Sequence, residues 1–98
     1  MTCNKSVKTG IGYDIHRLVE GPKLIIGGIE VNFEKGSVGH SDGDALIHSI
    51  VDALLGAASL GDIGEHFPSE NKKWKNEKSE LFLKFSTEKI RSIGYEIE

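Results

Sequence analysis

Apolar residues in the middle of the chain recur at three- and four-residue steps, which is the period of a helix with one buried side. This spacing predicts a helix over about residues 44–58. Its apolar positions are Leu46, Ile47, Ile50, Val51, Leu54, Leu55 and Ala58. The same helix would carry Asp44, His48 and Asp52 on one line, four residues apart. Packing does not require three titratable groups on one stripe, so we look for chemistry there.

Extended segments are predicted before this helix. Residues 7–16 roughly alternate between apolar and polar, which predicts a strand that runs into a polar turn. Residues 24–31 are also expected to be extended, but Gly27 and Gly28 interrupt them. Two short strands joined at the glycine pair and one strand with a bulge both fit this pattern. The glycines within residues 36–43 indicate a loop.

A polar segment and a second helix are predicted after the first helix. The composition of residues 61–77 indicates a loop, and loops of that length are usually functional or mobile. Residues 77–93 are expected to be helical up to Gly94, a residue that commonly ends a helix. The side chains expected to face inward are Leu81, Phe82, Phe85 and Ile93. Residues 95–98 alternate like the start of a strand, so we expect 1–98 to be a single domain that is incomplete at its C-terminus.

Composition narrows the class of protein. A length of 98 residues fits one domain, and a net charge of −3 gives no sign of a nucleic-acid partner. The one cysteine, Cys3, provides neither a disulfide framework nor a thiolate metal cage, which favours a reducing compartment. No apolar run approaches the roughly 20 residues that span a bilayer, so we expect no membrane partner. We expect a cytoplasmic protein, because the first residues look too short for a transit peptide, although a plastid location stays open.

Three residues form a candidate metal-ligand set. Asp14 and His16 are two apart, and an extended segment would point both side chains to one face. Together with His48 they provide three protein ligands, the number found in catalytic zinc sites that keep a fourth position open. Taken singly, they could be a turn aspartate, a surface histidine and a hydrogen-bonded helix histidine. Asp44 or Asp52 could accept the other N–H of His48 and so support it.

Polar residues also lie at both ends of the predicted helix. Asp42 or Asp44 can cap its start. His40 and Ser41 come just before it, where backbone N–H groups and the positive end of the helix dipole favour a phosphate. They could steady a developing charge on oxygen, or they could be only a cap and a loop histidine. The carboxylate and amides of residues 61–64 suit sugar hydroxyls, although the segment could equally be an ordinary helix-ending turn.

Five motifs occur in a fixed order along the chain. They are GYDIHRL at residues 12–18, GHSDGD at 39–44, DALLGAA at 52–58, LGDIG at 60–64 and HFP at 66–68. Together they resemble the 2-C-methyl-D-erythritol 2,4-cyclodiphosphate synthases, the cyclising enzymes of the non-mevalonate isoprenoid route. The resemblance extends over about residues 8–98.

This resemblance implies a fold, an assembly and two metal ions. The fold would be α+β, a mixed β-sheet with helices packed on one face in two layers, here without its C-terminal part. The protein would be a homotrimer with active sites between subunits, and a metal-dependent phosphorus–oxygen lyase. Asp14, His16 and His48 would hold a divalent metal, zinc. A second magnesium or manganese ion would bind with the substrate, and its protein ligand is absent from this chain.

The resemblance also implies the substrate, 4-(cytidine 5'-diphospho)-2-C-methyl-D-erythritol 2-phosphate. Its 2-phosphate would attack the β-phosphorus, giving the cyclic diphosphate and CMP, and His40 would stabilise the transition state as the catalytic residue. The residues expected to bind substrate are Asp14, Ile15, His16, His40, Ser41, Asp62, Ile63, Gly64, Phe67, Pro68, Ser69, Glu70 and Asn71. The sequence departs from the family at Ser69 and Asn71, where many relatives carry acids or a proline.

Two other functions are compatible with the same residues. A metal-dependent phosphohydrolase could use the three ligands to activate water. Alternatively, the chain could be an inactive metal-binding fragment. In the resembled family the cytosine pocket and the glutamate for the second ion lie beyond the matched part. We therefore expect the 98-residue chain alone to be inactive or nearly so.

Overall fold

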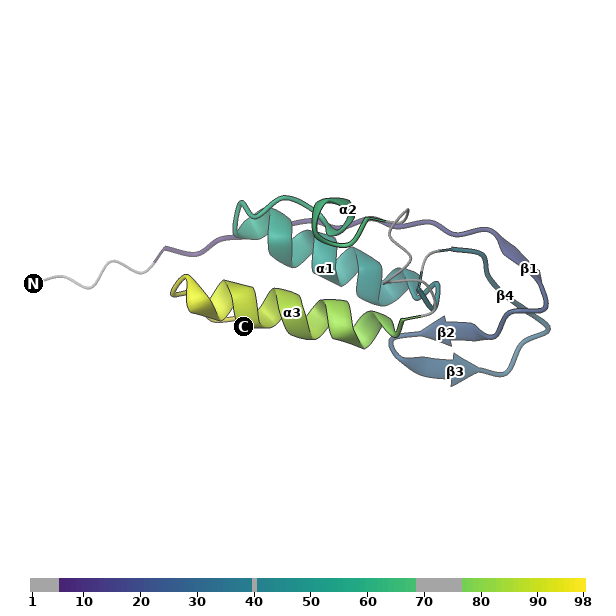
Figure 1. Ribbon diagram of the computed structural model, residues 1–98. Helices are drawn as coiled ribbons and strands as arrows, with labels where there is room; N and C mark the ends of the chain where they lie inside the picture. Colours follow the sequence, from purple (N-terminus) through teal and green to yellow (C-terminus); the bar gives the residue numbers. More distant parts are fainter. Residues whose placement is uncertain (1–5, 40, 69–76) are drawn as a thin grey trace, which may run out of the picture.

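The computed structural model describes residues 6–39, 41–68 and 77–98. The elements in these residues are β1 (Leu18–Glu20), β2 (Leu24–Ile26), β3 (Ile29–Val31), β4 (Lys35–Ser37), α1 (Ala45–Ala57), α2 (Ile63–His66) and α3 (Ser79–Ser92). Helices α1 and α3 pack side by side and run in the same direction (Figure 1). The strands gather at the end where both helices begin (Figure 1). The predicted α+β class is confirmed.

Strands β2 and β3 form an antiparallel hairpin. The paired residues are Leu24 and Val31, Ile25 and Glu30, and Ile26 and Ile29. Gly27 and Gly28 form the connecting turn, with φ angles of 63° and 80°. Two consecutive positive φ angles are typical of the type I′ turn, whose twist matches that of a hairpin. Of the two structures predicted for residues 24–31, the hairpin is therefore the correct one.

Strand β1 pairs antiparallel with β4, with Val19 opposite Gly36. The predicted loop over residues 36–43 is thus wrong at its start, because Gly36 and Ser37 belong to a strand. Only glycine fits at position 36, because a Cβ atom there would overlap the carbonyl oxygens of Pro22 and Lys23. The close approach of this backbone explains a glycine within a strand.

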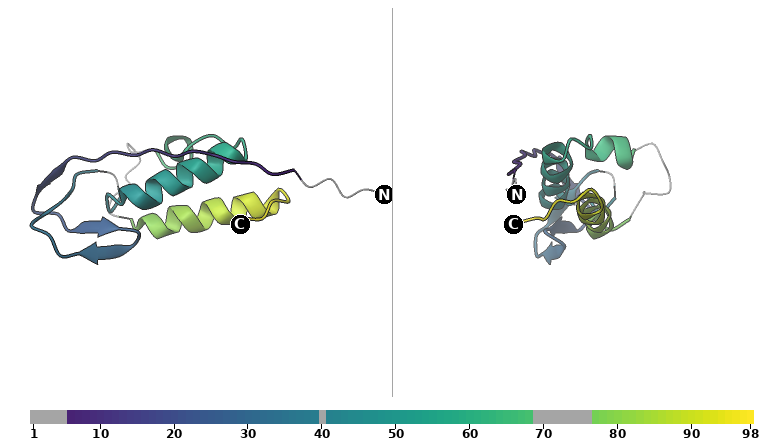
Figure 2. Two further views of the ribbon diagram at one scale, coloured as in Figure 1. Left: turned by 180° about the vertical axis from the view of Figure 1, so that it is seen from behind. Right: turned by 90° about the vertical axis from the view of Figure 1, so that its left-hand side faces the viewer.

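The strand predicted over residues 7–16 is wrong. Residues 6–16 pair with no strand of the described chain and instead run along α1 (Figure 2). The segment lies so close to the helix that a Cβ atom on Gly10 would overlap the carbonyl oxygen of Ala53. Its alternation therefore reflects one side resting on a helix rather than one face of a sheet.

The mixed sheet implied by the resemblance is not formed by the described residues. Their strands form two antiparallel pairs and no parallel pair. The segment around Gly10 and Gly12, which could have extended a sheet, is held against α1. The strand predicted at 95–98 is also wrong, because those residues have no strand partner in the described chain.

Asp44 is the N-cap of helix α1, and this settles the choice between two predicted caps. The Asp44 carboxylate accepts the Ile47 N–H at 3.0 Å, which satisfies one free donor of the first turn. The same carboxylate accepts the N–H groups of Gly27 at 3.0 Å and Gly28 at 2.7 Å. Asp44 is fully buried, and these bonds compensate for the loss of its hydration. One side chain therefore joins the hairpin turn to the start of the helix.

Helix α3 ends as the sequence predicts. The N–H of Gly94 donates to the Arg91 carbonyl at 3.0 Å, and the N–H of Tyr95 donates to the Ile90 carbonyl at 3.2 Å. This pair of bonds is the Schellman motif, which requires the positive φ of 94° found at Gly94. The predicted loop over 61–77 is wrong in one part, because α2 forms within it.

The core lies between α1, α2 and α3. Its buried apolar side chains are Ile47, Val51, Leu55, Phe67 and Phe82. The rings of Phe67 and Phe82 stack with centroids 4.3 Å apart. Leu81, Phe85 and Ile93 were predicted to face inward with Phe82, but each is more than a third exposed. Helix α3 packs mainly on one neighbour, so only a narrow stripe is covered, and it consists of Ser79, Phe82, Ser86 and Ile90. No helix in the described ranges is both long and apolar enough to cross a membrane.

Candidate metal and active site

Asp14, His16 and His48 converge at the start of α1. The Oδ2 atom of Asp14 lies 2.6 Å from Nε2 of His16 and 3.3 Å from Nδ1 of His48. One possible ligand atom from each residue lies within 4.8 Å of the other two. The predicted convergence of these three side chains is therefore confirmed, and together they could hold a metal ion.

Two glycines allow the backbone to bring these residues together. A Cβ atom on Gly12 would overlap the carbonyl oxygen of Ser49, so only glycine lets the segment that carries Asp14 lie against α1. A Cβ atom on Gly39 would overlap the ring of His16. The absence of both Cβ atoms lets chain segments far apart in sequence enclose one small site.

The ring of His16 is oriented by the backbone. Its Nδ1 atom lies 2.9 Å from the carbonyl oxygen of Val38. A carbonyl can only accept, so Nδ1 carries the proton and donates. The neutral ring then has its free lone pair on Nε2, the atom that faces Asp14. This is the tautomer needed for a metal bond through Nε2.

The ring of His48 is oriented by hydroxyl groups. Its Nε2 atom lies 2.8 Å from Oγ of Ser79 and 3.1 Å from Oγ of Ser41. Asp44 and Asp52 were predicted to support His48, and this is wrong. Asp44 accepts backbone N–H groups, and Asp52 accepts the N–H of Ile63 at 2.7 Å. Both carboxylates therefore accept hydrogen bonds from the backbone and not from the ring of His48.

Two donor atoms of the site face each other at 2.6 Å without forming a hydrogen bond. They are Oδ2 of Asp14 and Nε2 of His16, and both are buried. A buried polar atom without a partner is unfavourable by about 1–3 kcal/mol, so such atoms are usually compensated by a ligand or an ion. A carboxylate oxygen and two imidazole nitrogens are also the donors that zinc prefers. The residues present therefore fit a divalent metal.

Burial controls the charge of His48. The loss of hydration is the largest influence and lowers its pKa below the usual 6.5, while the Asp14 carboxylate raises it and His16 lowers it. The ring is consequently neutral at neutral pH, which is the form that binds metal.

Asp42 is held as a carboxylate. Burial raises its pKa, but the hydroxyl and backbone N–H of Ser79 and the N–H of Asp44 donate to it and together bring the pKa below 3.8. The backbone bonds are 3.0 Å from Ser79 N to Oδ2 and 3.1 Å from Asp44 N to Oδ1. Asp42 is thus a permanent acceptor beside the metal-ligand set.

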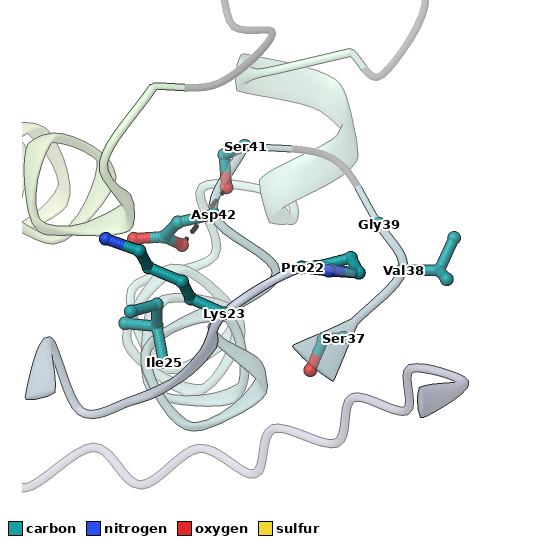
Figure 3. Close-up of a pocket in the computed structure, with 8 residues that line it drawn as sticks. All are labelled: Pro22, Lys23, Ile25, Ser37, Val38, Gly39, Ser41 and Asp42. Carbon is teal, nitrogen blue, oxygen red and sulfur yellow. Dashed lines mark hydrogen bonds between the residues drawn. The ribbon is translucent and has the colours of Figure 1, made fainter. Parts of the chain in front are cut away.

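A cavity of about 530 Å³ opens beside the turn that precedes α1 (Figure 3). It is lined by Pro22, Lys23, Ile25, Ser37, Val38, Gly39, Ser41 and Asp42. Val38 and Gly39 also contact the ring of His16, so the cavity and the metal-ligand set share a wall. The cavity can admit a polar ligand next to the ligand set. Lys23 could not be expected there from its position in the chain, since a single exposed lysine carries no signal.

The remaining predicted substrate residues have varied surroundings. Ile15 is 75% exposed, whereas Ser41 is buried and has a φ of 59°, unusual for a residue other than glycine. Asp62 caps α2 by accepting the Glu65 N–H at 2.9 Å, and the N–H of Ile63 donates to Asp52. Gly64 is exposed, Phe67 lies in the core, and Pro68 is half-buried. His40, Ser69, Glu70 and Asn71 lie outside the described residues.

Comparison with known proteins identifies the family. A model described as the YgbB family matches residues 7–98. The chain belongs to the YgbB family. Curated YgbB-like relatives include the 2-C-methyl-D-erythritol 2,4-cyclodiphosphate synthases of Treponema denticola and Salinibacter ruber. They are 52% and 51% identical over 94% and 91% of this chain, and the chain spans 57% of the length of each.

Solved structures support the same YgbB assignment. A 2C-methyl-D-erythritol-2,4-cyclodiphosphate synthase in a CDP-bound form matches with a TM-score of 0.81 and 42% identity, over 89% of this chain and 58% of that one. The bifunctional IspDF from Campylobacter jejuni matches with a TM-score of 0.85 and 46% identity, over 91% of this chain and 24% of that one. These matches confirm the α+β fold over most of the chain.

Proposed function

We propose that this YgbB-family protein cyclises 4-(cytidine 5'-diphospho)-2-C-methyl-D-erythritol 2-phosphate to 2-C-methyl-D-erythritol 2,4-cyclodiphosphate and releases CMP, in non-mevalonate isoprenoid biosynthesis. The observation that carries this proposal is the convergence of Asp14, His16 and His48, in which two buried donor atoms face each other without a hydrogen bond. About half of the residues are identical to those of relatives named as this synthase, which supports the choice of substrate.

The proposed reaction is an intramolecular displacement at phosphorus. An oxygen of the 2-phosphate forms a bond to the β-phosphorus, and the bond from that phosphorus to the bridging oxygen breaks. CMP leaves with the bridging oxygen, so the bonds formed and broken balance and no other reactant is consumed. Because both groups belong to one molecule, catalysis consists mainly of positioning and charge neutralisation, and no nucleophilic side chain is needed.

Each described residue of the site has a proposed role. Asp14, His16 and His48 would hold the divalent ion, which we propose to be zinc. Such an ion, when bound, acts as a Lewis acid and a template for phosphate oxygens. The Ser41 hydroxyl lines the cavity and can donate to a phosphate oxygen there. The partly buried ligand set and the cavity beside it would reduce the contact of the diphosphate with bulk water.

Other parts of the proposal extend beyond the described residues. His40 would stabilise the transition state, and Ser69, Glu70 and Asn71 would contact substrate. A second ion, magnesium or manganese, would bind together with the substrate. We also propose a cytoplasmic homotrimer with active sites between subunits, and an enzyme of the phosphorus–oxygen lyase class. The support for these points is membership of the YgbB family.

The matched length has a consequence for activity. The 98 residues span 57% of the Treponema denticola and Salinibacter ruber relatives. We propose that the 98-residue chain alone turns over substrate at least about 1,000-fold more slowly than a full-length relative, since binding and positioning of the nucleotide would be missing. Turnover within tenfold of a full-length relative would contradict this point.

A chimera tests the function separately from chain length. These 98 residues would replace the matching part of the Treponema denticola synthase, and ³¹P NMR would follow the products with zinc and magnesium present. Cyclic diphosphate with an equal amount of CMP is expected, and the chimera with Asp14→Asn should form neither. Linear phosphates would instead indicate a metal-dependent phosphohydrolase. Absence of both reactions in a folded, trimeric chimera would reject the proposed function.

A further inference from the structure

We propose that Ser79 is a positioning residue that connects Asp42 to His48 and fixes the tautomer in which His48 can bind a metal. Ser79 is the first residue of α3 and is fully buried. Its Oγ atom lies 2.8 Å from Nε2 of His48 and also forms a short hydrogen bond to Oδ1 of Asp42. This inference rests on the metal site of the proposed function.

The direction of each hydrogen bond follows from Asp42. An ionised carboxylate can only accept, so the Ser79 hydroxyl must donate its hydrogen bond to Asp42. A lone pair of the same hydroxyl then remains to accept a hydrogen bond from His48. The proton of the neutral His48 ring therefore lies on Nε2, and the lone pair lies on Nδ1, which faces Asp14 at 3.3 Å. The order of donors is His48 to Ser79 to Asp42.

Without this connection the other tautomer would be favoured. The Nδ1 atom of His48 could then carry the proton and donate a hydrogen bond to the nearby Asp14 carboxylate. That arrangement would occupy the lone pair needed for the metal and would tie up one of the other ligands. Ser79 and Asp42 thus select between two tautomers of one ring, as outer hydrogen-bond partners do for metal-binding histidines generally.

The backbone strengthens the same connection. The N–H of Ser79 donates to Oδ2 of Asp42 at 3.0 Å, so both oxygens of the carboxylate are engaged by one residue. Ser41 lies close by, with Oγ 3.1 Å from both Ser79 Oγ and His48 Nε2. Ser41 contacts Asp42 only at 3.5 Å, a distance at which a hydrogen bond is weak. Ser79 is therefore the better connected of the two hydroxyls.

Nitrogen-15 NMR of histidine-labelled, metal-free protein tests the inference. The His48 ring of the unmodified protein is expected to carry its proton on Nε2. In Ser79→Ala the proton is expected to move largely to Nδ1, and the zinc affinity, measured by competition with a chelator, is expected to fall about 10–100-fold. Asp42→Asn keeps the Ser79 hydroxyl but replaces one of the two acceptor oxygens with an NH2 donor, so the Ser79 hydroxyl is no longer forced to donate to residue 42, and the tautomer should shift in the same direction.

Ser86→Ala is the matched control. Ser86 is another fully buried serine of α3, and its hydroxyl bonds to the Phe82 carbonyl at 2.8 Å, not to the ligand set. This variant should keep both the tautomer and the affinity. The inference is overturned if Ser79→Ala retains the Nε2–H ring and binds zinc within twofold of the unmodified protein, or if Ser86→Ala changes both to the same extent. The tautomer is read without metal or substrate, so this result is independent of the cyclisation assay.

Discussion

The Nδ1 atom of His16 is hydrogen-bonded to the backbone carbonyl of Val38 at 2.9 Å. A main-chain acceptor cannot change its protonation state, so it fixes one tautomer of the ring. His16 is thereby prepared for metal through Nε2, whereas the tautomer of His48 depends on side chains. The two imidazoles of the site are oriented by different means for the same purpose.

The first prediction concerns the metal ligands. His48→Gln should lower zinc affinity by at least about 100-fold, because it removes one of three donors, a larger change than loss of an outer hydrogen bond. Equilibrium dialysis with metal analysis measures this. His66→Gln is the control, since His66 bonds to the Leu60 carbonyl at 2.7 Å and is not one of the three ligands. Equal zinc binding by the two variants would contradict the assignment.

A second prediction concerns the glycine that brings Asp14 to the helix. Gly12→Ala should lower the free energy of unfolding by about 1–3 kcal/mol, because the new methyl group would overlap the carbonyl oxygen of Ser49. Gly56→Ala is the control, since a Cβ atom there meets nothing within 4 Å. Gly56 lies in α1, so replacing it with alanine should raise the free energy of unfolding by about 0.5–1 kcal/mol. Urea unfolding should therefore show changes of opposite sign.

A third prediction separates two phenylalanines of α3. Phe82 is fully buried against Phe67, so Phe82→Ala should reduce the free energy of unfolding by about 3–5 kcal/mol. Phe85 is 38% exposed, so Phe85→Ala should have a distinctly smaller effect. Thermal unfolding of both variants measures the difference. Similar losses would mean that the predicted wider inward face of α3 was right after all.

The fourth prediction is a pH dependence of the metal-free protein. The folded pKa of His48 is lowered, so below pH 6.5 the unfolded chain binds more protons than the folded one. Stability should therefore fall as the pH drops below 6.5 and continue to fall until the folded pKa is passed. Urea unfolding at pH 7.5 and 5.5 should show this loss, and His48→Gln should reduce it. An unchanged loss in the variant would assign it to other groups.

Asp42 should also make the protein less stable as the pH falls, but at a lower pH than His48 does. Its folded pKa lies below 3.8, so its contribution to stability is complete above 3.8 and is lost as the pH falls through the folded pKa. Asp42→Asn should be destabilised near neutral pH and should lose less stability on further acidification. Unfolding curves between pH 5 and pH 2.5 would separate this contribution from that of His48.

Local patterns in the sequence predicted much of the fold. The spacing of apolar residues predicted both long helices, and Gly94 predicted where α3 ends, because these are properties of single segments. The Gly27 and Gly28 pair correctly indicated a hairpin as one of two choices. The exposed side of α3 could not be predicted in this way, since it depends on how many neighbours the helix has. Leu81 and Phe85 are apolar but have too little covering them.

The candidate site was likewise predicted where local patterns carry it and missed where it depends on distant parts of the chain. Asp14, His16 and His48 were identified from residue types and motif order, and their convergence is confirmed. The partners of His48 were missed, because Ser79 is 31 residues further along the chain and a lone serine carries no pattern. Asp44 and Asp52 looked like better partners by spacing on the helix. Their carboxylates instead bind backbone N–H groups, which a helical stripe alone does not reveal.

The carboxylate of Asp44 has a broader effect than capping one helix. It accepts hydrogen bonds from the turn of the β2–β3 hairpin and from the first turn of α1. Neither element can open without releasing the same buried charge, so hairpin and helix should become unprotected against hydrogen exchange at a common free energy. His48 lies one turn into that helix. The arrangement that positions its ring should therefore persist only as long as the hairpin and the helix both stay closed.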